Sequence, residues 1–92
     1  MSDNSKIVRN SEIIHSSLDD EIIMMSIEKG EYYGLSSIGG RIWELIKEPR
    51  MLSDICHKLC EDYNVTPVNC RRDVLDFITH MLEKDLVIIV DE

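Results

Sequence analysis

The chain has 92 residues, of which 43% are hydrophobic, and a formal net charge of -8 at pH 7. This length suits one small domain, and so acidic a chain repels nucleic acids, whose phosphates are bound by lysine and arginine. The sequence has neither a run of about eighteen apolar residues that could span a bilayer nor the apolar segment of a signal peptide. We therefore expect a cytoplasmic protein that binds neither membranes nor nucleic acid.

Residues 1–10 are mostly polar, and we expect them to form a flexible N-terminal arm with at most a short strand. Residues 11–92 are expected to form a single domain. This domain begins with three antiparallel strands, where β-branched and aromatic residues alternate between turn residues. The strands are expected at residues 12–16, 21–28 and 31–35. Lys29 and Gly30 favour a two-residue hairpin turn with positive φ at the glycine.

After residue 35 the hydrophobic period changes from two to about 3.6, which predicts amphipathic helices. Three helices are expected to end near residues 47, 63 and 84, and a short strand follows at residues 86–90. Ser36 is the expected N-cap of the first helix, and Thr66-Pro67 begin the third. The predicted fold is an α+β domain resembling a winged helix-turn-helix, with a three-stranded antiparallel sheet followed by three helices.

Three cysteines and three histidines are candidates for metal binding or nucleophilic catalysis. Cys56 and Cys60 are one helical turn apart, but both fall on the apolar side of the second helix, where small hydrophobic residues are expected. No C-x-x-C pair is present, and no histidine has the spacing of a catalytic base beside a cysteine. We expect reduced, buried thiols, no metal, no cofactor and no enzymatic activity. A redox role of the cysteines stays open.

Residues 30–46, GEYYGLSSIGGRIWELI, contain all four glycines of the chain. The strand at residues 31–35 should lie at a sheet edge, where unpaired backbone groups can pair with another chain. Gly34 inside this strand indicates a bulge or the close approach of another backbone. Gly39 and Gly40 each weaken the following helix by about 1 kcal/mol relative to alanine. Two explanations remain open, namely tight packing of helix against sheet and docking of a ligand strand.

The same run, followed by DYNV and then by DVLDFITHMLEKDLV, resembles the PqqD-like family of peptide-recognition domains. The resemblance covers nearly the whole chain and is greatest to the stand-alone recognition proteins of lasso-peptide biosynthesis. It implies a recognition element that binds the leader segment of a ribosomally synthesised precursor peptide and has no catalysis of its own. The implied partners are the leader peptide, a leader-cleaving cysteine protease of the same pathway and, as a further candidate, the cyclase.

The resemblance further implies that the leader adds as a strand beside the third strand, in the cleft between that strand and the third helix. In β-strand addition, backbone hydrogen bonds give affinity and side-chain pockets give specificity. The expected leader-binding residues come from the strand and from the facing helix. They are Glu31, Tyr32, Tyr33, Gly34, Leu35, Arg71, Arg72, Val74, Leu75, Phe77, Ile78 and Met81.

Two other functions stay open. The peptide chaperone of pyrroloquinoline quinone biosynthesis, which serves a radical enzyme, shares the sequence pattern. A winged helix-turn-helix could also place its third helix in the major groove of DNA. However, Arg71 and Arg72 of that helix are balanced by Asp73, Asp76 and Glu83. The exposed edge strand is compatible with either a monomer or a strand-swapped dimer.

Overall fold

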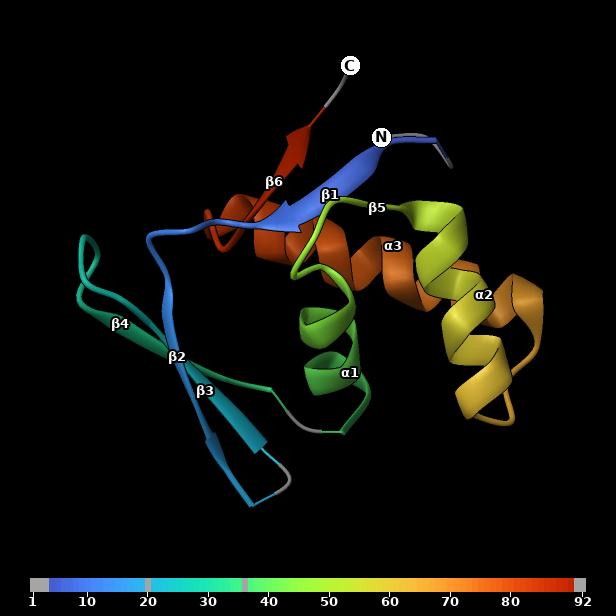
Figure 1. Ribbon diagram of the computed structural model, residues 1–92, viewed down its shortest axis with the longest axis horizontal. Coiled ribbons are helices and arrows are strands. Elements are labelled where there is room, and N and C mark those ends of the chain that lie inside the picture. Colours follow the sequence, from blue (N-terminus) through green and yellow to red (C-terminus); the bar gives the residue numbers. More distant parts are fainter. Residues whose placement is uncertain (1–3, 20, 36, 91–92) are drawn as a thin grey trace.

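The structure is a computed structural model that describes residues 4–19, 21–35 and 37–90. Within these residues the chain forms two three-stranded antiparallel sheets and three helices (Figure 1). The first sheet has the order β2-β3-β4, with β2 (Ile14–Leu18), β3 (Glu21–Ser26) and β4 (Glu31–Leu35). The helices are α1 (Ser37–Leu45), α2 (Leu52–Asp62) and α3 (Pro67–Glu83). The predicted α+β fold, a three-stranded antiparallel sheet followed by three helices, is confirmed.

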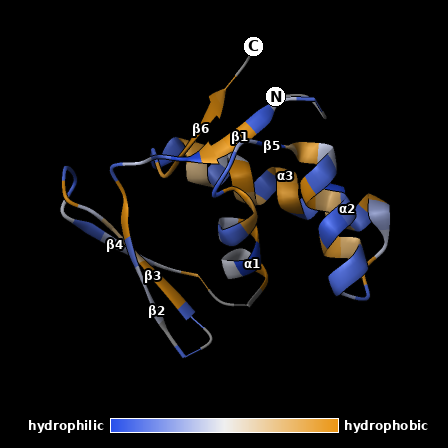
Figure 2. Cartoon of the chain, in the orientation of Figure 1, coloured by the Kyte–Doolittle hydropathy of each residue, from blue (hydrophilic) through white to orange (hydrophobic). Residues whose placement is uncertain are grey.

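A second sheet joins segments that are far apart in the sequence, in the order β5-β1-β6. Its strands are β1 (Lys6–Arg9), β5 (Arg50–Met51) and β6 (Val87–Val90). In β1, Ile7 lies opposite Ile89 of β6 and is fully buried, and both strands carry hydrophobic residues (Figure 2). The short strand allowed for within residues 1–10 is present as β1, and it belongs to the folded domain because Ile7 enters the core and β1 pairs with the C-terminal strand.

The β3–β4 hairpin also differs from its prediction. Ser26 pairs with Glu31, so residues 27–30 form a four-residue loop in place of the expected two-residue turn. The amide of Gly30 donates a hydrogen bond of 2.8 Å to the carbonyl oxygen of Ser26. Gly30 has a φ of 65°, so the predicted positive φ is confirmed, and a residue with a side chain would be strained there.

The helix boundaries follow local capping chemistry. The predicted N-cap of α1, Ser36, lies outside the described residues. Thr66 caps α3 as predicted, because its Oγ1 accepts a hydrogen bond of 3.4 Å from the amide of Asn69, which satisfies a free donor of the first turn. None of the helices in the described ranges combines the length and the apolar character that a bilayer crossing requires.

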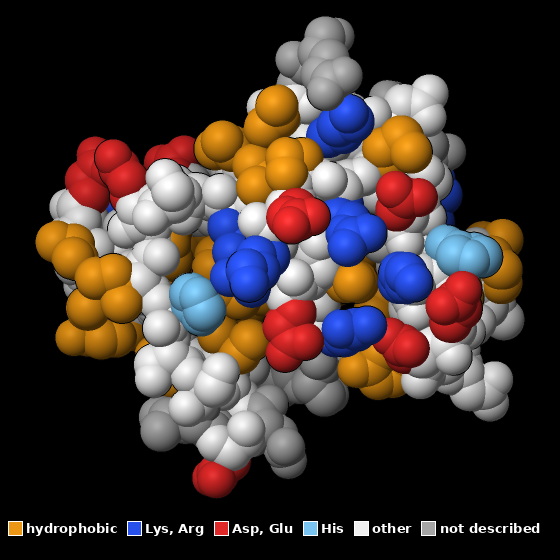
Figure 3. Space-filling view, in the orientation of Figure 1, with side chains coloured by type: hydrophobic (Ala, Val, Ile, Leu, Met, Phe, Trp, Pro, Cys, Tyr) orange, Lys and Arg blue, Asp and Glu red, His pale blue; other side chains and the backbone are white. Residues whose placement is uncertain are grey.

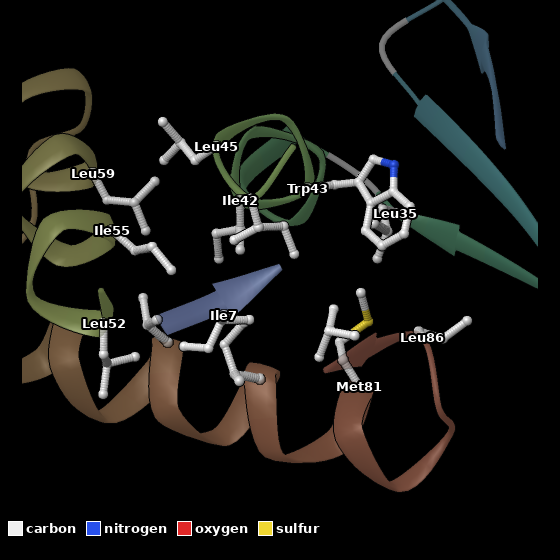
Figure 4. Packing of buried hydrophobic residues seen from close by; sticks show 14 of the residues in the cluster. Ile7, Leu35, Ile42, Trp43, Leu45, Leu52, Ile55, Leu59, Met81 and Leu86 are labelled. Atoms are coloured by element: carbon white, nitrogen blue, oxygen red, sulfur yellow. The ribbon is translucent and has the colours of Figure 1, made fainter. Parts of the chain in front are cut away.

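The core lies where the three helices and both sheets meet, and side chains of α1, α2, α3, β1 and β4 point into it (Figure 4). Trp43 of α1 is fully buried. The guanidinium Cζ of Arg9 lies 4.8 Å from the centroid of the Trp43 ring, and Arg9 Nε donates a 2.7 Å hydrogen bond to the Trp43 carbonyl. Arg9 therefore fastens β1 to α1 through both stacking and hydrogen bonding.

Candidate functional site

A groove with a volume of about 370 Å³ opens beside the C-terminal end of β4. Strand β4, all three helices and the turn before α3 contribute to its surface. The lining residues are Gly34, Leu35, Ile38, Gly39, Ile42, Leu59, Tyr63, Val65, Cys70, Asp73, Val74 and Phe77. Asp73 is the one charged side chain among them. The groove is therefore suited to apolar side chains, with a single carboxylate beside them.

The floor of the groove depends on the close approach of α1 to its neighbours. A Cβ added to Gly39 would lie 3.3 Å from Cε1 of Phe77 and 3.4 Å from Cδ2 of Leu35. A Cβ on Gly40 would lie 3.5 Å from Cδ1 of Ile22 in β3. Of the two explanations left open by the sequence, tight packing of helix against neighbouring elements accounts for Gly39, whereas the contact at Gly40 is an ordinary one that does not require a glycine.

One edge of β4 pairs with β3, and no strand of the described residues pairs with the other edge. In an antiparallel strand, alternate residues direct their backbone N–H and C=O to opposite edges. One alternate set of residues therefore directs its backbone N–H and C=O groups to the free edge. This set is either Tyr32 and Gly34 or Glu31, Tyr33 and Leu35. Gly34 and Leu35 also line the groove. The free edge thus runs directly into an apolar groove.

The predicted site residues of β4 differ in exposure along the strand. Leu35 is buried, whereas Glu31 is exposed and Tyr32 is 71% exposed. Tyr33 is half-buried, and Lys84 Nζ lies 5.4 Å from the centroid of its ring. Burial raises the pKa of the Tyr33 hydroxyl above its ordinary value, and the Glu31 carboxylate raises it further. Leu35 and Tyr33 therefore face the interior, while Tyr32 faces solvent.

The predicted apolar residues of α3 divide between groove and core. Val74 and Phe77 line the groove. Ile78 and Met81 are 0% and 3% exposed and are not among the lining residues. Leu75 is half-buried and packs against the core cluster without lining the groove. The structure therefore brings two of these five side chains to the groove, and the other three pack within or against the core.

The two predicted arginines lie outside the groove lining. Arg71 lines a separate hollow with Cys56 and Cys60, and Arg72 Nε lies 3.7 Å from an oxygen of the Asp73 carboxylate. On the face shown in Figure 3, lysine and arginine side chains are interspersed with aspartate and glutamate. That face therefore presents no block of positive charge.

The contribution of α1 and α2 to the groove was not predicted from the sequence. Ile38, an apolar residue of the first amphipathic helix, is 43% exposed at the groove. Tyr63 and Val65, at the end of α2 and after it, also line the groove. The sequence does carry a signal for Ile38 at the groove. This residue lies one helical turn before Ile42 and shortly after the edge strand.

The three cysteines are free thiols, of which Cys70 is buried while Cys56 and Cys60 are partly exposed. In the part of the chain that the structure describes, no group of three or more histidine, cysteine, aspartate or glutamate side chains is arranged to hold a metal ion.

Comparison with known proteins gives a family and a fold. A family model described as Coenzyme PQQ synthesis protein D (PqqD) matches residues 21–87. A solved structure described as TbiB1 in complex with the TbiA(beta) leader peptide is 27% identical, with a TM-score of 0.84 over 92% of this chain and 99% of the other. A structure of lasso peptide synthetase B1 complexed with the leader peptide shares the fold, at 20% identity and a TM-score of 0.80 over 89% and 96% of the two chains. No curated protein sequence matches the chain.

Proposed function

The chain belongs to the PqqD family, and we propose that it is a non-catalytic recognition protein for the leader segment of a ribosomally synthesised precursor of a lasso peptide. The leader adds as a strand to the free edge of β4 and inserts apolar side chains into the adjoining groove. The continuity of edge and groove carries this proposal, since Gly34 and Leu35 belong to both.

The comparison at 27% identity supports the proposal, because that structure is of a protein in complex with a leader peptide and its similarity to this chain extends over 99% of its length. A peptide strand can bind here without any rearrangement of the sheet, since β4 already ends its sheet on one side. Backbone pairing then gives affinity that depends little on sequence. The groove supplies the selection for particular side chains.

We assign different tasks to the residues around the groove. Among Glu31, Tyr32, Tyr33, Gly34 and Leu35, the alternate residues that face the free edge provide the backbone groups that pair with the leader. Val74 and Phe77 form the apolar wall opposite the strand, and Leu75, Arg71 and Arg72 flank the bound peptide along α3. Ile78 and Met81 act from the core, where they hold α3 in position.

The bound leader is presented to the next proteins of the pathway. These are a cysteine protease that removes the leader and the cyclase that closes the ring. Because the precursor is a ribosomal product, we place this step in the cytoplasm. The binding protein contributes no reacting group, and its effect is to hold the precursor at high local concentration beside the protease.

The proposal is tested by titrating the chain into a fluorescently labelled synthetic leader, taken from the precursor gene beside its own gene. Ile38→Asp places a charge in the groove, and Val68→Asp is the matched control, since Val68 is 79% exposed and does not line the groove. Both positions lie in the first turn of a helix, where aspartate is favourable.

We expect Ile38→Asp to weaken leader binding about tenfold, because it replaces apolar burial with a charge that must lose its hydration. Val68→Asp should bind as the wild type does. Absence of saturable binding by the wild type up to about 100 µM would contradict the proposed function. Equal affinity of the two variants would place the leader elsewhere on the surface.

A further inference from the structure

Asp73 is the one charged side chain that lines the groove beside β4. The Nε atom of Arg72 lies 3.7 Å from one oxygen of the Asp73 carboxylate, and both side chains are largely exposed. That separation exceeds the length of a hydrogen bond, and exposed ion pairs contribute little free energy. The Asp73 carboxylate is therefore available to a ligand that enters the groove.

The charges around the groove favour a positively charged ligand group. Asp62 directly precedes the lining residue Tyr63, and its carboxylate lies 3.0 Å from Arg41 Nε. The same guanidinium lies 3.5 Å from the carboxylate of Glu44, so two carboxylates share one cation. The chain as a whole has a net charge of -8. Both the local and the overall charge therefore attract a cation toward Asp73.

Two contacts show how α3 runs past β4. Near the C-terminal end of the helix, Lys84 Nζ lies 5.4 Å from the centroid of the Tyr33 ring. Two turns earlier, Phe77 lies near Leu35, the last residue of β4, because a Cβ added to Gly39 would lie 3.3 Å from the former and 3.4 Å from the latter. Toward its N-terminus, α3 therefore passes the end of β4 at Phe77.

Asp73 lies one helical turn beyond this point, on the same side of α3 as Phe77, since residues four apart are neighbours on a helix. A helical turn advances about 5.4 Å, and two residues of a strand advance about 6.8 Å. Side chains two positions apart also point to the same side of a strand. In an extended leader, the side chain that reaches Asp73 therefore belongs to a residue two positions from the one that packs against Phe77.

We propose that Asp73 selects leaders that carry a lysine or arginine two positions from an apolar residue packed against Phe77, an inference that rests on the proposed function. The charged end of this side chain pairs with the Asp73 carboxylate, while its aliphatic stem covers apolar residues of the groove. The basic residue lies outside the segment that pairs with β4. Its contact therefore adds selectivity to a backbone pairing that depends little on sequence.

The role of the charge is tested with Asp73→Asn, which removes the negative charge and keeps the size of the side chain. Asp76→Asn is the matched control, because Asp76 is exposed on the same helix and does not line the groove. The labelled leader is titrated with each variant at about 50 mM and about 500 mM salt. We expect Asp73→Asn to raise the Kd about two- to fivefold at the lower salt concentration and by less at the higher one. Asp76→Asn should bind as the wild type does.

The partner in the leader is identified with synthetic leaders in which each lysine or arginine is replaced singly by methionine, which keeps an unbranched stem. We expect one replacement to cost as much affinity as Asp73→Asn and to cost nothing further in combination with it. That residue should lie two positions from an apolar residue whose replacement by alanine also weakens binding. Asp73→Lys should regain affinity when the leader carries glutamate at the basic position.

Wild-type affinity of Asp73→Asn, additive effects for every basic residue, or tight binding of a leader that has no lysine or arginine overturns the inference and leaves the proposed function intact. A loss that is equal at both salt concentrations and coupled to a tyrosine-to-phenylalanine replacement in the leader also overturns it, because the carboxylate would then accept a hydrogen bond from an uncharged hydroxyl. Absence of leader binding by the wild type contradicts the proposed function and the inference with it.

Discussion

Gly34 of β4 lies opposite Ile23 of β3, and a Cβ added to Gly34 would stand 3.8 Å from Cδ1 of Ile23. This is an ordinary contact distance, so packing within the sheet does not require a glycine at this position. Gly34 is also exposed and lines the groove. The proposed approach of the leader backbone along the free edge offers a reason for a glycine here.

Gly34→Pro tests whether this amide pairs with the leader. If the amide points to the free edge, proline removes one donor without breaking the β3–β4 pairing, and we expect leader affinity to fall at least about tenfold. Gly34→Ala keeps the amide and fits beside Ile23, so it should lose less affinity than the proline variant, by the amount that its methyl group hinders the approaching backbone. Fluorescence titration measures affinity, and thermal unfolding checks the fold. A folded proline variant with wild-type affinity would move the leader away from this amide.

Gly39→Ala should separate leader binding from stability. The new methyl group meets Phe77 at 3.3 Å, so the half-buried ring must shift, and Phe77 lines the groove. Alanine gains up to about 1 kcal/mol of helix propensity, which offsets the strain. We expect a change of less than about 1 kcal/mol in the free energy of unfolding and a several-fold loss of leader affinity. Urea unfolding and leader titration measure the two quantities.

Gly40→Ala is the matched control for this substitution, since its methyl group would face Ile22 at 3.5 Å and Gly40 does not line the groove. It should stabilise the chain and leave leader affinity unchanged. If both variants lost affinity equally, a general disturbance of α1 rather than the shape of the groove would be responsible.

Ile7→Ala should show that β1 is an integral part of the domain. The side chain is fully buried, and its truncation leaves a cavity that costs about 2–5 kcal/mol in the free energy of unfolding. Val8→Ala is the control, because Val8 is only partly buried and lies opposite Ile88, which is 47% exposed. Urea unfolding measures both. If both substitutions lowered the free energy of unfolding by similarly small amounts, residues 6–9 would be a flexible arm and not an integral part of the domain.

The elements that sequence analysis predicted well are those with local signals. Thr66 and Pro67 mark the beginning of α3 by capping chemistry, and Gly30 marks the hairpin through its positive φ. In the second sheet only the strand at residues 87–90 was predicted with its own bounds, because this sheet joins residues 6–9, 50–51 and 87–90. Its stability comes from pairing and packing between these distant segments, which no short stretch of sequence encodes.

The residues that line the groove could be predicted from the sequence only where they belong to the repeating apolar pattern of a single helix. Val74 and Phe77 belong to the apolar pattern of α3, as Ile78 does, and periodicity alone cannot separate the side that faces the groove from the side that faces the core. Ile38 and Tyr63 reach the groove because α1 and α2 pack beside β4. That relative placement is a tertiary property, which local patterns do not specify.

The buried Cys70 thiol should make the stability of the reduced chain depend on alkaline pH. Burial, together with the neighbouring Cys56 thiol, raises its pKa from 9.0 to about 12. The unfolded chain therefore releases this proton at lower pH than the native chain does. The stabilising contribution is fully present below about pH 9 and is lost as pH rises toward about 12, by at most about 1.4 kcal/mol for each pH unit.

Cys70→Ala removes this titration. We expect the variant to be less stable than the wild type near neutral pH, because it loses buried contacts. This difference in the free energy of unfolding should shrink above about pH 9, because only the wild type then loses the contribution of the Cys70 thiol. Ile55→Ala is the control, since Ile55 is 0% exposed and does not titrate. Urea unfolding under reducing conditions at about pH 7 and about pH 10 measures both differences. Tyrosine and lysine side chains titrate equally in all three proteins, so they do not change the differences in the free energy of unfolding. If the difference between Cys70→Ala and the wild type were as independent of pH as that for Ile55→Ala, the raised pKa of Cys70 would be contradicted.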